Sequence, residues 1–176
     1  MLAPQINVVA TPLDLPWAKE LNYNFQKYKN YRYIMGDLEY GEMRFRGQIE
    51  QIYETELIIK FFKSKISKAW LVIGPVGINE FNCKVRYKDI VSAMSKKYGP
   101  PRFREIIRES IMEELVFASE CYAIGVGVAE INTTWKIPHF EIEASLFSDE
   151  GIIYIEIEYV YIPLKGMSES SLHNHL

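Results

Sequence analysis

The most regular pattern of hydrophobic and polar positions lies in the last quarter of the chain. Residues 140–147 (FEIEASLF) and 152–162 (IIYIEIEYVYI) alternate apolar and polar side chains with a period of two. This is the period of a strand with one buried face. The link from Ser148 to Gly151 holds turn-forming residues. The pattern therefore predicts a terminal β-hairpin whose apolar face belongs to the core.

A second hairpin is predicted earlier in the chain. Residues 56–63 (ELIIKFFK) and 69–73 (AWLVI) are rich in β-branched and aromatic side chains and are short for independent helices. The polar stretch 64–68 links them. Glycine and proline at 74–77 end the second strand, because proline lacks a backbone donor. A further strand is expected to start at residues 43–45.

Three segments show the helical period instead. Apolar side chains recur at steps of three and four over residues 17–28, 87–98 and 102–123. The second segment ends in lysines and Gly99, followed by two prolines, which together form a strong stop signal. The pattern therefore predicts three helices, the first of them short.

Strand groups joined by hairpin links, with helices between them, indicate an α+β fold rather than a βαβ series. We expect a mainly antiparallel sheet of about five to six strands, with two to three helices packed on one face. Residues 1–166 are predicted to form a single domain that begins with a proline-containing arm at 1–16. Residues 167–176 are predicted to form a flexible polar tail.

Composition narrows the classes of function. Of the 176 residues, 48% are hydrophobic, and 20 basic against 23 acidic residues give a net charge of -3. This balance argues against duplex nucleic acid as a partner, since its binders usually carry excess positive charge. No apolar run reaches the roughly 18 residues that span a bilayer. We expect a cytoplasmic protein, or a periplasmic or exported one whose signal peptide has been removed.

The two cysteines, Cys83 and Cys121, form no CxxC motif. Sequence alone leaves open whether they are bridged. We favour two free, buried thiols, because free cysteine is among the most buried residue types.

Within residues 57–161, a hairpin leads to a helix that ends Lys97-Tyr98-Gly99-Pro100, and Trp135 precedes two alternating strands. This order of elements resembles small bacterial exported or lipid-anchored domains of uncharacterised function. The resemblance implies a curved antiparallel sheet and an envelope location. It brings no catalytic residues, and both the 102–123 segment and the amino-terminal aromatic segment lie outside it.

The sequence contains no complete motif for catalysis or for binding a cofactor. The glycines at 74–77 and 125–127 lack the third glycine and the βαβ setting of a nucleotide-binding loop. The histidines at 173 and 175 lie in the predicted tail. His139 has no identifiable partner for a general base role. We therefore expect no cofactor and do not favour an enzyme.

One candidate surface is aromatic and basic. The run from Asn22 to Tyr33 (NYNFQKYKNYRY) interleaves aromatic and cationic side chains and contains no acid. Such a surface can stack on the bases of single-stranded nucleic acid or on a glycan. We favour the simpler interpretation, a helix that packs its aromatic side inward. The candidate ligand-binding residues are Tyr23, Lys27, Tyr28, Tyr31 and Arg32.

The second candidate surface is the polar side of the terminal hairpin. A four-residue turn would pair Glu143 with Glu156 and Glu141 with Glu158, and these four glutamates are named the acidic face. Directly opposed like charges are destabilising. A neighbouring strand with Lys84 and Arg86, a divalent cation, a basic protein or solvent screening could each offset them. We favour lysines or solvent.

Three functions follow from these surfaces. The first, which we prefer, is a non-enzymatic binding or protein-interaction domain. The second is a metal-assisted enzyme that uses the acidic face. The third is an acidic, immunity-type inhibitor of a basic toxin. The sequence leaves the ligand, partner and oligomeric state open.

Overall fold

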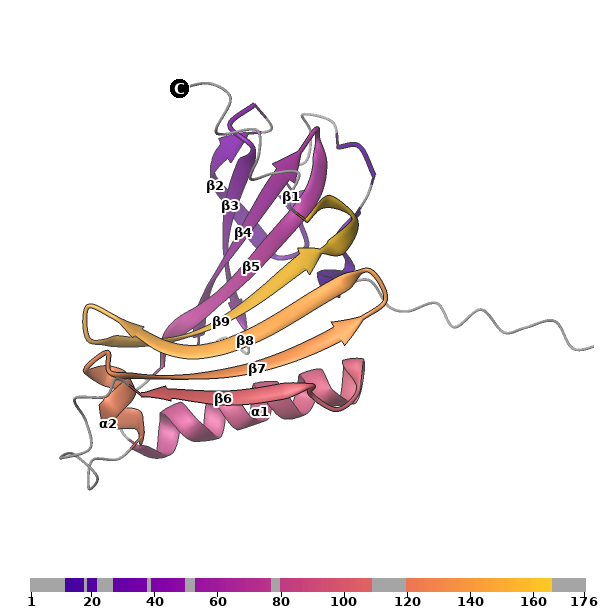
Figure 1. Ribbon diagram of the computed structural model, residues 1–176. Helices are drawn as coiled ribbons and strands as arrows, with labels where there is room; N and C mark the ends of the chain where they lie inside the picture. Colours follow the sequence, from indigo (N-terminus) through magenta and orange to yellow (C-terminus); the bar gives the residue numbers. More distant parts are fainter. Residues whose placement is uncertain are drawn as a thin grey trace, which may run out of the picture.

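A computed structural model describes residues 12–17, 19–21, 27–37, 39–49, 53–76, 80–108 and 120–165. Their main feature is one open, twisted antiparallel sheet (Figure 1). Its strands are β1 (Lys27–Tyr28), β2 (Tyr31–Asp37), β3 (Glu42–Ile49), β4 (Tyr53–Phe62), β5 (Lys65–Val76), β6 (Phe103–Arg108), β7 (Ala129–Ile137), β8 (Phe140–Asp149) and β9 (Ile152–Tyr161). Their order in space is β1-β2-β3-β4-β5-β9-β8-β7-β6. These nine strands, of which β1 has only two residues, exceed the five to six that we predicted.

The described residues form two α-helices, which lie on one face of this sheet. Helix α1 (Glu80–Tyr98) contacts β5, β7 and β8, and α2 (Glu120–Gly125) contacts β7, β8 and β9. Figure 1 shows α1 running alongside β6 and β7. Two short 3-10 turns, Pro12–Asp14 and Ile162–Leu164, flank the sheet. No helix among the described residues is long and apolar enough to cross a membrane.

The core fills the space between the helices and the alternate residues of the strands. In β8 and β9 the alternate apolar residues from Phe140 to Leu146 and from Ile153 to Tyr159 are buried, as the sequence pattern predicts, and Ser145 and Val160 are buried as well. Trp135, 2% exposed, donates from Nε1 to the Gly99 carbonyl at 3.1 Å and so fixes the end of α1. Trp17 packs edge-on against Phe140 at 5.0 Å between ring centroids. The amino-terminal segment therefore helps to close the core.

Both predicted hairpins are present, but with shorter turns. Lys63 and Ser64 link β4 to β5, where we expected a link over 64–68. Glu150 and Gly151 link β8 to β9, both with positive φ (49° and 81°), as tight hairpin turns require. Glu143 therefore faces Glu158, not Glu156, and Glu141 faces Val160. A shift of two residues leaves every side chain on its predicted face.

Two helix predictions are wrong within the described residues. In the 17–28 segment, Trp17 lies in a turn and residues 27–28 form β1, so no helix joins them. In the 102–123 segment, Phe103–Arg108 forms β6, which pairs with β7 over its whole length. The hydrogen-bonding edge of β7 outweighs the helical pattern of side chains there. The middle of that segment, residues 109–119, lies outside the described residues, as does the predicted tail.

Helix α1 begins seven residues before the predicted start at residue 87, at Glu80. Lys84 and Arg86 therefore lie on a helix rather than on a strand beside the acidic face. The expectation of two free thiols is also wrong: Cys83 of α1 and Cys121 of α2 are bridged, with 6.2 Å between their Cα atoms. Both cysteines are fully buried, so the bridge fastens the two helices inside the core.

Candidate functional site

The acidic face lies on the side of the sheet opposite the helices. Glu141 and Glu143 extend from β8, and Glu156 and Glu158 from β9, each between two buried core residues. Glu143 directly opposes Glu158 across the two strands. The structure thus brings the four predicted glutamates together, and Glu130 of β7 adds a fifth carboxylate that influences Glu143 and Glu156 electrostatically.

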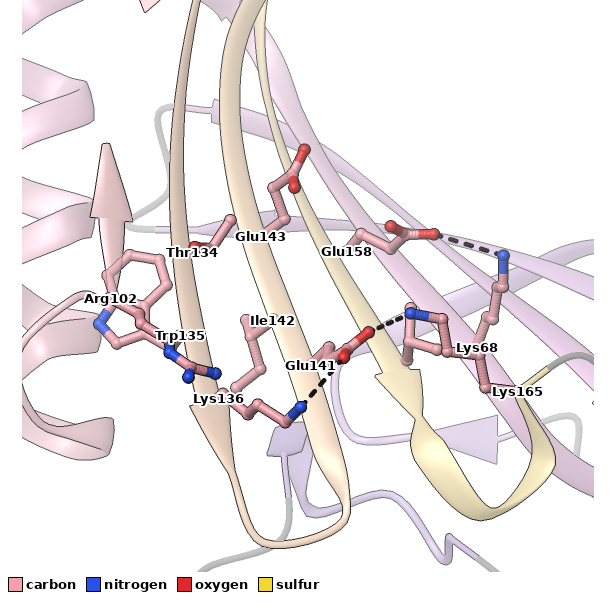
Figure 2. Close-up of a pocket in the computed structure, with 11 residues that line it drawn as sticks. Lys68, Arg102, Thr134, Trp135, Lys136, Glu141, Ile142, Glu143, Glu158 and Lys165 are labelled. Carbon is pink, nitrogen blue, oxygen red and sulfur yellow. Dashed lines mark hydrogen bonds and ion pairs between the residues drawn. The ribbon is translucent and has the colours of Figure 1, made fainter. Parts of the chain in front are cut away.

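One end of the acidic face is neutralised by lysines. Glu141 accepts a hydrogen bond from Lys165 and lies 3.6 Å from Lys136 Nζ, and Lys68 Nζ lies 3.8 Å from Glu158 (Figure 2). The hydrogen bond from Lys165, helped by the charges of both lysines, lowers the pKa of Glu141. The prediction that lysines offset the carboxylates therefore holds at this end, although the lysines are not those we named.

These groups line a hollow of about 370 Å³ in the outer surface of β7, β8 and β9. Its cations are Lys68, Arg102, Lys136 and Lys165, and its carboxylates are Glu141, Glu143 and Glu158. Figure 2 shows Glu143 in this hollow without an ion pair to any of the residues drawn. The hollow thus joins the neutralised end to the rest of the acidic face.

The other half of the acidic face has no such compensation. Burial raises the pKa of Glu143 and of Glu156, and the nearby charge of Glu158 raises both further. Glu143 accepts one long hydrogen bond, 3.4 Å, from the Ser145 hydroxyl. Among the described residues, the Glu156 carboxylate has no hydrogen-bond partner and forms no ion pair. Two half-buried carboxylates thus stand beside like charges, and the described part of the chain supplies no cation to pair with them.

A buried acceptor without a donor lies in the same row of side chains. Asn132 of β7 pairs with Ser145, which pairs with Glu156. The Asn132 amide oxygen is buried and has no hydrogen-bond partner among the described residues. Buried polar atoms normally have partners. The centre of the acidic face is therefore rich in acceptors and poor in donors.

An indole that was not among the predicted site residues borders the acidic face. Trp70 of β5 pairs with Glu158 in the register, and the Nζ atoms of Lys60 and Lys68 lie 5.1 Å and 5.8 Å from its ring centroid. A cation placed over the face of an indole ring is attracted by the negative charge density of that face. The alternation within residues 69–73 could have placed Trp70 on this face, but not beside β9.

The aromatic and basic surface does not form as one surface. Tyr23 lies outside the described residues, and Lys27 and Tyr28 form the two-residue strand β1. Tyr31 lies under Gly47, and its hydroxyl accepts a hydrogen bond from Thr55 at 3.3 Å. Arg32, next in the strand, is exposed. The alternation of aromatic and basic residues is thus the period of a strand, which divides Tyr31 and Arg32 between two faces.

No group of three or more His, Cys, Asp or Glu side chains among the described residues could hold a metal ion. His139 is exposed in the turn between β7 and β8, with φ at 68°. The arrangement of the acidic face is suited to binding positive charge.

Comparison with known proteins gives no relative: no family model, no curated protein and no solved structure matches this chain.

Proposed function

We propose that this chain is a non-enzymatic binding domain and that its acidic face receives a basic segment of a partner protein. The observation that carries the proposal is the pair Glu143 and Glu156: both carboxylates are half-buried, both have a raised pKa, and neither forms an ion pair with any described residue. A carboxylate in this state is stabilised when a cation arrives. A lysine or arginine side chain supplies that charge together with hydrogen-bond donors.

The unpaired acceptors favour a donor-rich partner over a simple counter-ion. Asn132 contributes a buried amide oxygen beside the carboxylates, and the guanidinium group of arginine presents five N–H donors in a fixed plane. Trp70, already in contact with two lysines, provides a further surface for a cation. Trp70 pairs with Glu158 in the register of β5 and β9, so it lies next to the acidic face. An extended basic segment can therefore contact both the carboxylates and the indole ring.

The two alternative functions use the same carboxylates. A metal-assisted enzyme lacks support, since the described residues contain no cluster of three metal-binding side chains. An inhibitor of a basic toxin is a special case of the proposal, in which the basic partner is an enzyme that the acidic face blocks. Inhibition of the partner by the bound domain would identify that case.

We further propose an extracytoplasmic location, in the bacterial envelope. The bridge between Cys83 and Cys121 supports this location, because disulfides persist in oxidising compartments and are rare in the cytosol. The resemblance of the 57–161 segment to exported domains is in agreement with it.

The test is calorimetric titration of the protein with a short peptide of lysines and arginines, at low and at physiological salt. Wild-type protein should bind the peptide, and the affinity should fall as salt rises. The double variant Glu143→Gln/Glu156→Gln should bind at least about tenfold more weakly, since it loses two charged contacts.

The matched control is Glu39→Gln/Glu54→Gln, which removes the same number of charges from exposed positions outside the acidic face. This control should bind as wild type does, within about twofold. Equal losses in the two double variants would reduce the binding to net charge and refute the proposal. So would the absence of binding by wild-type protein at low salt.

A further inference from the structure

A second polar hollow lies on the opposite side of the sheet, where α1, α2 and the β6 edge meet. Its volume is about 270 Å³, and it is named the basic pocket. The residues that line it are Lys84, Tyr87 and Lys88 of α1, Arg104 of β6, Glu120 of α2 and Ile131 of β7. It is separate from the acidic face, which lies on the other side of β7 and β8.

Charge in the basic pocket is unbalanced. Three cationic side chains line it against one carboxylate, and that carboxylate, Glu120, forms an ion pair with Lys84 at 2.8 Å. Among the described residues, Lys88 and Arg104 have no carboxylate partner. Both are exposed, so a solute can reach them. Within the described part of the chain, the pocket therefore holds two positive charges that no carboxylate offsets.

The geometry concentrates these charges. Lys84 and Lys88 are four residues apart on α1, a spacing that places them on one side of the helix and makes like charges repel. Arg104 enters the pocket from β6, where it pairs with Thr133 of β7 in the sheet register. Convergence of like charges from two elements costs stability unless an anion offsets it.

Hydrogen bonds and the disulfide hold the surroundings of the pocket in place. The Tyr87 hydroxyl donates to the Ala144 carbonyl at 2.8 Å and lies 2.9 Å from Thr133 Oγ1, so its hydrogen bonds are already made inside the protein. The disulfide joins Cys83 to Cys121, the immediate chain neighbours of Lys84 and Glu120. The bridge therefore holds the α1 and α2 sides of the pocket in register, and a fixed frame reduces the ordering cost of binding.

We infer that the basic pocket binds a phosphate-type oxyanion carried on a small organic group. The planar fork of Arg104 suits two oxygens of one phosphate, and Lys88 suits a point contact to a third. Since a water occupies about 30 Å³, a pocket of about 270 Å³ has room for roughly nine waters. A bare phosphate fills only part of that space, and the rest can hold the attached group. A free phosphomonoester and a phospholipid headgroup share this chemistry.

The test uses the oxidised, full-length protein and two probes. Glycerol phosphate is titrated by calorimetry at low salt, and phosphatidylcholine vesicles with and without phosphatidic acid are tested by co-sedimentation. The variants are Arg104→Gln and Lys88→Gln, which change exposed side chains and so should leave the fold intact, as circular dichroism can verify. Lys96→Gln is the matched control, because Lys96 is an exposed lysine of the same helix outside the pocket.

We expect binding of at least one probe, weakened about tenfold by Arg104→Gln and less by Arg104→Lys, with Lys96→Gln within about twofold of wild type. Binding of glycerol phosphate alone would indicate a soluble ligand, and binding only to vesicles with phosphatidic acid would indicate a headgroup. Failure of both probes to bind wild-type protein would overturn the inference. Equal weakening by Arg104→Gln and Lys96→Gln would also overturn it, because the attraction would then be diffuse.

Discussion

The disulfide offers the strongest quantitative test of the fold. Cys83 and Cys121 are separated by 38 residues and are both fully buried. In the chain-entropy description, closing a loop of that length removes enough freedom from the unfolded chain to stabilise the protein by about 4 kcal/mol. The double variant Cys83→Ala/Cys121→Ala should lose an amount of this order from its free energy of unfolding.

Urea unfolding followed by tryptophan fluorescence measures this loss. With a urea dependence of roughly 2 kcal/mol per molar, the midpoint of the double variant should fall by about 2 M. Wild-type protein with reductant should unfold at the midpoint of the variant, and reductant should leave the variant unchanged. This comparison separates the effect of the bridge from that of the two substitutions.

Two results would refute the reasoning. One is a loss below about 1 kcal/mol in the double variant, which would mean that the bridge does not constrain the unfolded chain. The other is the detection of two reactive thiols in wild-type protein unfolded without reductant. That result would restore the free cysteines that the sequence pattern favoured.

Four further predictions concern single residues. Glu156→Gln should raise the free energy of unfolding at neutral pH, because it removes a half-buried charge that lies near Glu158 and Glu130. The pKa of Glu156 is raised, so its ionisation costs stability as the pH rises above the ordinary value of 4.5, and the gain should vanish in acid. Glu141→Gln should instead lower the free energy of unfolding, because the pKa of Glu141 is lowered in the folded protein. This loss should disappear as the pH falls through that lowered pKa. Urea unfolding at neutral and acidic pH measures both the gain for Glu156→Gln and the loss for Glu141→Gln. Tyr87→Phe should cost about 1–3 kcal/mol by leaving buried partners unsatisfied, and an ultraviolet titration should lose one phenol that ionises at about 12. Gly36→Ala should lower the thermal midpoint more than Gly99→Ala: both glycines have positive φ, but a Cβ at Gly36 would lie 2.2 Å from a backbone oxygen of β3, whereas at Gly99 it would meet nothing within 4 Å. Equal shifts in the midpoint would contradict that reasoning.

The strands of the two hairpins could be predicted because a period of two determines which side chains face the core. The register of β8 and β9 could not, since it depends on whether the turn has two or four residues. Glu143 therefore opposes Glu158 instead of Glu156. The prediction of which side chains lie on each face of the hairpin was still right, because the predicted register was wrong by two residues, an even number.

The wrong helix at 102–123 has a different cause. Its first part, β6, has side chains that fit a helical stripe, and only the edge of β7 makes the extended form favourable. The residues of β7 that form this edge lie outside the 102–123 segment, so the helical pattern within that segment gives no sign of them. The segment at 17–28 is similar, since Trp17 is buried by contacts with Phe140 and Tyr161, which lie near the other end of the chain.

The composition of the acidic face was predictable, but its charge balance was not. The four glutamates follow from the alternation in two neighbouring strands. The lysines that neutralise Glu141 and Glu158 come from three other places: β5, β7 and the turn that ends at Lys165. Which carboxylates remain without a cation therefore depends on the order of strands in the sheet, which no local pattern determines.

The most direct test of the proposed function is a pH titration of the glutamate side-chain carboxyls by nuclear magnetic resonance, without and with the basic peptide. The account predicts that Glu143 and Glu156 titrate above the ordinary carboxyl value of 4.5 in the free protein. It also predicts that both pKa values fall when the peptide binds, because a cation then offsets the charge. Ordinary pKa values in the free protein, or raised values that the bound peptide leaves unchanged, would contradict the claim that these carboxylates form the binding face.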